Sequence, residues 1–130
     1  MIEINREELA HAGGLFTGEG CISFAQKYPN PNPRKVPRPQ LQIQMTDLPP
    51  LQRFQAAVGG LGKIYGPYQR KPSRAARDPK PTWTWTCSGY VPVQAVIAML
   101  WPWLCPRRQA RAAEVLDLYL AWDYPEEKAA

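Results

Sequence analysis

The sequence predicts an α+β fold in the order αββαββαα, a twisted four-stranded antiparallel sheet with helices packed on one face. Two observations predict it. Segments with the apolar spacing of helices alternate with pairs of segments that show the two-residue alternation of strands. Each predicted strand pair is joined by a proline-rich segment of loop-like composition, so that neighbouring strands run antiparallel. The chain of 130 residues is long enough for one such domain, and we expect residues 1–130 to form it.

The first helix is expected over residues 5–17. Asn5 is a good N-cap, and Glu8 stands three residues later, which is the capping-box pattern. Apolar and small residues then recur at helical spacing and form one face of the helix. We expect Gly18 and Gly20 to end it.

The first two strands are expected over residues 21–27 and 37–45, joined by the segment 28–36, which holds three prolines. Both strands alternate between apolar and polar side chains, as strands do when they bury one face of a sheet. In the second strand the polar positions are mostly glutamine, whereas a solvated sheet face more often carries Thr, Lys and Glu. The predicted sheet therefore has a polar face rich in amide groups.

The second helix is expected to begin after Asp47, its N-cap, because Pro49 and Pro50 fit the first turn of a helix. Gly59 and Gly60 follow its apolar stripe and are expected to stop it.

The second strand pair is expected over residues 61–68 and 82–88, joined by the basic segment 69–81. Two further helices are expected over residues 91–104 and 107–122. The threonines of the last strand are expected to face outward. Four tryptophans are expected to face the core: Trp83, Trp85, Trp101 and Trp103.

Positive charge is concentrated in the middle of the chain. The net charge is +5, but residues 26–80 carry +9, whereas residues 1–25 carry −3 and residues 81–130 carry −1. This distribution indicates a polyanionic partner such as nucleic acid. A basic surface that only keeps the protein in solution is the simpler alternative.

Several classes of protein do not fit the sequence. It has no run of about 18 apolar residues and no signal peptide, so we expect an intracellular protein without a membrane partner. Cys21, Cys87 and Cys105 lack zinc-ligand spacing and are expected to be reduced and mostly buried. His11 is the only histidine, and no nucleophile stands beside it in the sequence. We expect no organic cofactor.

Residues 12–20, AGGLFTGEG, resemble the LAGLIDADG motif of homing endonucleases. Thr17 takes the place of the first acidic residue of that motif. The segment 102–110 is similar to the family's helix-to-helix segment, and the resemblance covers about residues 9–122 with one motif copy. Five residues match the motif in kind: Gly14, Leu15, Gly18, Glu19 and Gly20.

The resemblance implies a Mg²⁺-dependent, site-specific double-strand DNA endonuclease (a homing endonuclease) that acts as a homodimer on a long pseudo-palindromic site. Such enzymes are associated with introns or inteins. Mn²⁺ is expected to substitute for Mg²⁺, and Ca²⁺ to bind without supporting cleavage. The resemblance implies Glu19 and the Gly18 carbonyl as metal ligands. It also places Arg107, with Arg108 beside it, where the family has a basic residue that assists catalysis.

Physical reasoning about the carboxylate agrees with a dimer. One carboxylate holds a divalent cation poorly, whereas two Glu19 side chains at a dimer axis form the oxygen-rich cluster that phosphodiester cleavage requires. Small residues on the first helix allow two copies of it to pack closely. The residues expected at this interface are Ala10, Gly13, Gly14 and Thr17.

The polar sheet face, a saddle in the family, is expected to lie in the major groove of double-stranded DNA. Glutamine suits contact with adenine there and arginine suits guanine, while loop cations reach phosphates. Strand alternation and the basic loops predict the following contacts: Ser23, Ala25, Lys27, Arg34, Lys35, Arg38, Gln40, Gln42, Gln44, Lys63, Tyr65, Arg70, Lys71, Arg74, Arg77, Lys80, Thr84 and Thr86.

Two other functions fit the sequence. The first is a non-cleaving nucleic-acid-binding protein of the same fold, an RNA maturase or a decayed endonuclease. It is motivated by Thr17, Met45 and Arg107, which differ from the residues that the family usually has at these places. The second is a small α+β interaction protein with a basic surface.

Overall fold

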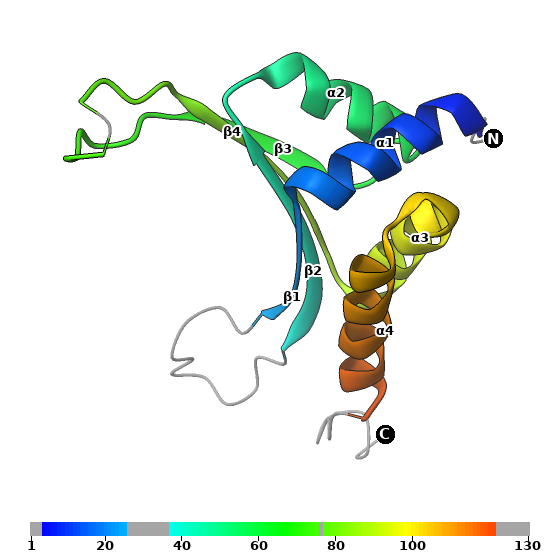
Figure 1. Cartoon of the computed structure of the whole chain (residues 1–130). Coiled ribbons are helices and arrows are strands. Elements are labelled where there is room, and N and C mark those ends of the chain that lie inside the picture. Colours follow the sequence, from blue (N-terminus) through cyan, green and yellow to red (C-terminus); the bar gives the residue numbers. More distant parts are fainter. Residues whose placement is uncertain (1–3, 26–36, 76, 122–130) are drawn as a thin grey trace.

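A four-stranded antiparallel sheet in the order β1-β2-β4-β3 is the centre of the computed structural model (Figure 1). The structure describes residues 4–25, 37–75 and 77–121. The predicted class and element order are confirmed. The elements are α1 (Arg6–Glu19), β1 (Gly20–Ala25), β2 (Arg38–Met45), α2 (Leu48–Ala57), β3 (Lys63–Tyr68), β4 (Thr82–Ser88), α3 (Tyr90–Leu100), the 3₁₀ turn η1 (Trp101–Trp103) and α4 (Pro106–Ala121).

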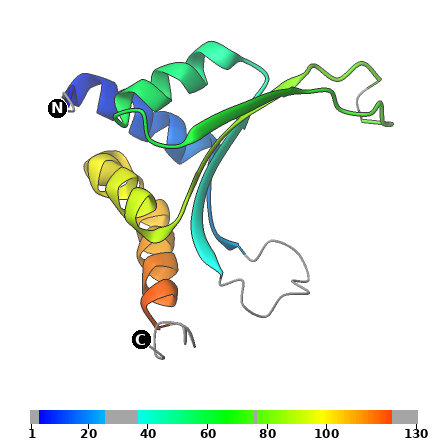
Figure 2. The same cartoon turned by 180° about the vertical axis from the view of Figure 1, so that it is seen from behind.

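In the described parts of the chain, the four α-helices lie on one face of the curved sheet, and no helix covers the opposite face (Figures 1 and 2). Strand alternation produces this division, because one side of each strand is apolar and the other polar. The apolar side chains meet the helices in one core. Its sheet residues include Ile22, Leu41, Ile43, Trp85 and Cys87, all of which are buried.

An aromatic cluster joins the helices to the sheet at the centre of this core. The ring of Phe54, from α2, lies edge-on to Trp85, with ring centroids 4.7 Å apart. The ring of Phe16, from α1, also stacks on Phe54, with ring centroids 6.2 Å apart. The end of α1 is therefore anchored to the sheet by buried aromatic rings.

The first helix extends beyond its predicted end. Asn5 Oδ1 accepts a hydrogen bond from the Glu8 N–H at 3.1 Å, as the capping pattern predicts. Gly18 does not end the helix, since a glycine weakens a helix without stopping it. The chain leaves the helix at Gly20, where a Cβ would lie 2.6 Å from the ring of Phe16, so only glycine fits.

The predicted helix over residues 91–104 is two elements. The α-helix α3 ends at Leu100, and Pro102 lies in the 3₁₀ turn that follows, because a proline ring cannot continue an α-helix. Leu100 and Leu104 fill the core on either side of this turn, and Trp101 faces outward with 41% of its surface exposed. The prediction that Trp101 is a core residue is wrong.

The other three predicted core tryptophans pack as expected. Trp85 is fully buried, and Trp83 and Trp103 are partly buried against the core. In the described ranges, no helix is long and apolar enough to cross a membrane.

Candidate nucleic-acid interface

The helix-free face of the sheet is a continuous polar surface. Cross-strand pairing aligns the outward-facing residues of the strands in rows, since paired residues in an antiparallel sheet share a face. Arg38, opposite Ala25, is exposed at one end of this surface. Three rows follow: Ser23, Gln40 and Ser88; Cys21, Gln42, Thr86 and Lys63; and Gln44, Thr84 and Tyr65. Register therefore brings the predicted strand contacts onto one surface.

Two threonines of this face are much less accessible than predicted. Thr82 is 1% exposed and Thr84 is 8% exposed. The strand β4 lies between β2 and β3, and the longer side chains of Gln44 and Tyr65 flank Thr84 on both sides. Thr84 is therefore largely covered by its neighbours and its DNA contact stays a prediction, whereas Thr86 is partly exposed.

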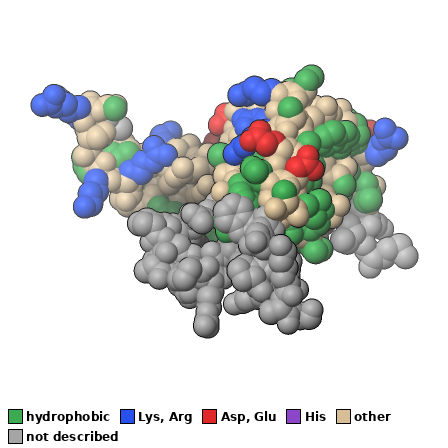
Figure 3. Space-filling view, turned by 90° about the horizontal axis from the view of Figure 1, so that it is seen from below, with side chains coloured by type: hydrophobic (Ala, Val, Ile, Leu, Met, Phe, Trp, Pro, Cys, Tyr) green, Lys and Arg blue, Asp and Glu red, His purple; other side chains and the backbone are tan. Residues whose placement is uncertain are grey.

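The β3–β4 connection projects from the sheet as an arm (Figures 1 and 2). Gln69 Nε2 donates a hydrogen bond to the Pro79 carbonyl at 2.9 Å and joins the two sides of this arm. Figure 3 shows basic side chains spread along it. The predicted contacts Lys27, Arg34 and Lys35 lie outside the described residues. Five predicted phosphate contacts on the arm are exposed: Arg70, Lys71, Arg74, Arg77 and Lys80.

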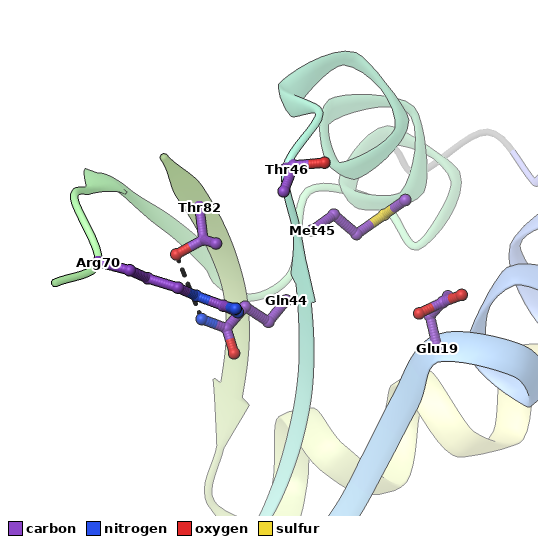
Figure 4. A pocket seen from close by; sticks show the side chains of 6 residues that line it. All are labelled: Glu19, Gln44, Met45, Thr46, Arg70 and Thr82. Atoms are coloured by element: carbon purple, nitrogen blue, oxygen red, sulfur yellow. Dashed lines mark hydrogen bonds between the residues drawn. The ribbon is translucent and has the colours of Figure 1, made fainter. Parts of the chain in front are cut away.

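Glu19 is the last residue of α1 and is exposed at the point where the helix meets the sheet. The free carbonyl groups at a helix C-terminus carry the negative end of the helix dipole, so a cation is favoured at this position. A hollow of about 270 Å³ lies beside the carboxylate (Figure 4). Its lining residues come from α1, from the end of β2 and the residue after it, from the arm and from the start of β4: Glu19, Gln44, Met45, Thr46, Arg70 and Thr82.

The start of α4 is hydrogen-bonded to the last turn of α1. Arg108 Nε donates to the Thr17 carbonyl at 3.3 Å, and the Cys105 N–H donates to Thr17 Oγ1 at 3.4 Å. The positive end of one helix thus meets the negative end of the other. The predicted basic pair therefore lies at the turn that carries Glu19, with Arg108 bound to the backbone and Arg107 exposed.

Cys105 lies immediately before α4, and the pKa of its thiol is lower than that of an ordinary cysteine. The backbone N–H of Arg108 donates a hydrogen bond to it, which is the largest cause of the lowered pKa of Cys105. Partial desolvation opposes this shift, and the backbone N–H of Arg107 and the charges of both arginines lower the pKa by smaller amounts. Cys87 is the opposite case, since burial raises its pKa to about 11.

The small residues of α1 predicted at a dimer interface fall into two groups. A Cβ on Gly13 would lie 2.5 Å from the Cβ of Trp103, so the close approach at Gly13 occurs within the chain, and its place in a dimer interface stays a prediction. Thr17 is partly covered by the start of α4. Gly14, by contrast, has no described atom within 4 Å of its Cβ position, and Ala10 is partly exposed beside it. Gly14 and Ala10 remain on the open side of α1.

The described residues contain no group of three His, Cys, Asp or Glu side chains that could hold a metal ion. What the end of α1 offers is a set of hard oxygen donors, the Glu19 carboxylate and the exposed Gly18 backbone, which suits Mg²⁺ better than a soft metal. These donors of one chain are fewer than the six or more oxygen ligands that such a cation takes.

Three residues of this surface were not among the predicted contacts. Cys21 and Ser88 are exposed members of the polar rows, and strand alternation alone could have found both. The exposure of Cys21 also contradicts the expectation that the cysteines are mostly buried. Thr82 joins the hollow because β4 lies next to β2, and no sequence signal gives that neighbour relation.

No family model and no curated protein matches this chain. Solved structures do match. The homing endonuclease I-CvuI, in complex with its target Sro1.3 in the presence of 2 mM Ca, is 23% identical over 88% of this chain, with a TM-score of 0.64. I-CvuI with an I-CreI target and 2 mM Mg, in which the DNA is not cleaved, is 21% identical over 93%, with a TM-score of 0.60.

A third match is the group I intron-encoded homing endonuclease I-CeuI complexed with DNA, 16% identical over 92% of this chain, with a TM-score of 0.64. The chain has the fold of the LAGLIDADG homing endonucleases. A single LAGLIDADG-like motif, in the helix that ends at Glu19, fits this fold. The chain spans 66% and 71% of the lengths of the two I-CvuI chains and 58% of the I-CeuI chain.

Proposed function

We propose that this chain is a site-specific double-strand DNA endonuclease that acts as a homodimer, uses Mg²⁺ and recognises a long pseudo-palindromic site. The observation that carries the proposal is the position of Glu19. Its exposed carboxylate ends a helix at the border of a polar, amide-rich sheet face and lines a hollow together with Arg70. The three similar homing endonuclease structures all hold DNA, which supports the same partner here.

The sheet face would read the DNA. A twisted two- to four-stranded surface fits the major groove, and glutamine side chains are suited to base edges because each carries both a donor and an acceptor. Gln40, Gln42 and Gln44 lie on consecutive outward positions of β2 and are at least partly exposed. The basic arm would contact phosphates and so contribute affinity rather than sequence preference.

Glu19 and the Gly18 carbonyl of each chain would hold the divalent cation, with the partner copy supplying the second carboxylate. When bound, the cation activates water and stabilises the leaving oxygen of the phosphodiester. Arg107 is exposed at the start of α4 and would stabilise phosphate charge, for which a guanidinium is better suited than for carrying a proton. Arg108 would hold the turn that bears Glu19, through its hydrogen bond to Thr17.

The test is the Glu19→Gln variant. Duplexes with a randomised central region are incubated with the protein and Mg²⁺, and the cleaved sequences define a site. On that site we expect Glu19→Gln to lose cleavage by at least about a thousandfold, because the carboxylate is the main protein ligand, and to bind within a few-fold of the wild type. Glu7→Gln is the matched control, since Glu7 is an exposed carboxylate on the same helix far from the hollow.

Two outcomes would contradict the proposal. Unchanged cleavage by Glu19→Gln would remove Glu19 from the active centre. Specific binding without any cleavage by the wild type, with Mg²⁺ or Mn²⁺, would instead identify the non-cleaving binder that Thr17, Met45 and Arg107 suggest.

A further inference from the structure

We infer that Arg70 binds the phosphate at which the DNA is cut, and that it therefore acts in the candidate active centre as well as on the basic arm. This inference rests on the proposed function. It concerns the hollow beside Glu19, which Arg70 also lines (Figure 4).

The exposed cations of the arm do not share one location. Arg70 is the arm cation that lines the hollow of about 270 Å³ together with Glu19. Arg74 and Arg77 line a separate hollow of about 450 Å³ further along the arm. The structure thus separates one cation next to the candidate active centre from others that lie outside it.

The hollow holds two opposite charges that do not neutralise each other. Glu19 and Arg70 are the only charged residues among those that line it, and they form no ion pair with each other. Figure 4 shows the Arg70 side chain extending from the arm toward Gln44, with the Glu19 carboxylate across the hollow. Both charged groups are therefore available to ligands of opposite sign.

This arrangement of charge suits a phosphodiester next to a divalent cation. A carboxylate attracts the cation that the proposed function requires and repels a phosphate. A guanidinium attracts the phosphate, and its planar donors can pair with two phosphate oxygens. The hollow is many times larger than the space that one water molecule needs. Glu19 and Arg70 thus provide one side for the cation and one side for the phosphate.

The position of Arg70 predicts an effect on the rate of cleavage as well as on affinity. Hydrolysis places further negative charge on the oxygens of the phosphate that is cut, and a guanidinium beside them stabilises that charge. Arg107 is not among the residues that line the hollow, so Arg70 is the guanidinium that the structure places there. A cation that contacts only outer phosphates changes affinity and its dependence on salt.

The first experiment locates the phosphate without measuring cleavage. The duplex selected by the wild type is bound in Ca²⁺, and neutral methylphosphonates replace its phosphates one at a time. Neutralising the phosphate that the wild type cuts in Mg²⁺ should weaken binding of the wild type about tenfold more than binding of Arg70→Ala, because only the wild type loses a charge-assisted contact there. Arg74→Ala is the matched comparison, and the phosphate at which it differs from the wild type should lie further from the cut.

The second experiment measures how fast the bound duplex is cut, in a single turnover with saturating protein and Mg²⁺. We expect Arg70→Ala to cut about a hundredfold more slowly than the wild type. Arg70→Lys keeps the charge but loses the paired donors, so its rate should lie between the two. Arg70 is exposed and outside the core, so both variants should unfold in urea as the wild type does.

The failures of the two proposals can be told apart. If the wild type cuts its site and Arg70→Ala at saturation cuts it equally fast, this inference is wrong and the proposed function stands. The same holds if Arg70→Ala differs from the wild type only at a phosphate other than the one that is cut. If the wild type cuts no duplex, the proposed function fails, and this inference with it.

Discussion

Gly13 and Gly14 are adjacent in α1 but have opposite surroundings. Gly13 is packed against Trp103, and Gly14 has open space where a side chain would be. Each glycine lowers the stability of a helix by up to about 1 kcal/mol relative to alanine. Only at Gly13 does the fold gain a compensating contact, the close approach of α1 and η1.

Alanine at these two positions should therefore have opposite effects. We expect Gly13→Ala to lower the free energy of unfolding by about 1–2 kcal/mol, since the new methyl group overpacks against Trp103 by more than the helix gains. Gly14→Ala should raise it by about 0.5–1 kcal/mol. Urea unfolding, at a concentration where the chain is monomeric, measures both. Equal effects of the two substitutions would show that Gly13 is not packed as described.

The residues that the sequence predicted best are those whose position depends on local chemistry. Asn5 caps α1 because its side chain reaches only its own helix. Trp101 was misplaced because its orientation depends on where Pro102 ends α3, and the low exposure of Thr84 was missed because it depends on the neighbouring strands. The motif in the sequence was enough to select Glu19 as a candidate site residue. The hollow beside it could not be predicted, because residues distant in the sequence line it.

Cys105, at the junction between α1 and α4, has a thiol whose pKa depends on the start of α4. Its thiol lies at the N-terminus of α4, where backbone N–H groups stabilise the thiolate, so its pKa is lowered. A lowered thiol pKa means that the reactive thiolate is present at a lower pH than in an ordinary cysteine, whose pKa is about 8.5. The state of this thiol therefore reports whether α4 begins where the structure places it.

We expect iodoacetamide to modify Cys105 with a pH midpoint below that of an ordinary thiol. The measurement uses Cys21→Ser, because Cys21 is exposed and would also react, and follows the modified peptide by mass spectrometry. Cys87 is buried with a raised pKa and should react only on unfolding. Arg108→Ala should retain most of the shift, since its main cause is a backbone N–H. A midpoint at or above the ordinary value would contradict this helix start.

The strand order β1-β2-β4-β3 could not be predicted from the sequence, because the sequence does not say which strands of the two hairpins are neighbours in the sheet. The two predicted hairpins imply that β1 pairs with β2 and β3 with β4. They do not imply that β2 pairs with β4, which is the contact that unites the two hairpins in one sheet. That join places Gln44 beside Thr82, which lies 38 positions further along the chain, and forms the hollow next to Glu19. Long-range packing therefore produced the part of the site that the sequence could not predict.

The charge distribution has a spatial counterpart in the fold. The basic segment 69–81 becomes an arm that extends from the sheet, and the helical side carries paired charges, such as Arg53 with Glu8 at 2.9 Å. Arg53 lowers the pKa of Glu8 through this hydrogen-bonded pair, so the pair persists as pH falls until Glu8 is protonated. Among the described residues, none of the five arm cations forms an ion pair, and this positive charge lies on the side where the proposal places DNA.

A single chain offers one exposed Glu19, and cleavage of two strands at one site requires two such carboxylates. The central claim is therefore that two copies of this chain assemble on one duplex. Native mass spectrometry of the protein with its selected site measures this directly. We predict a complex of one duplex with two chains of 14.7 kDa each. A specific complex that contains only one chain per duplex would contradict the account.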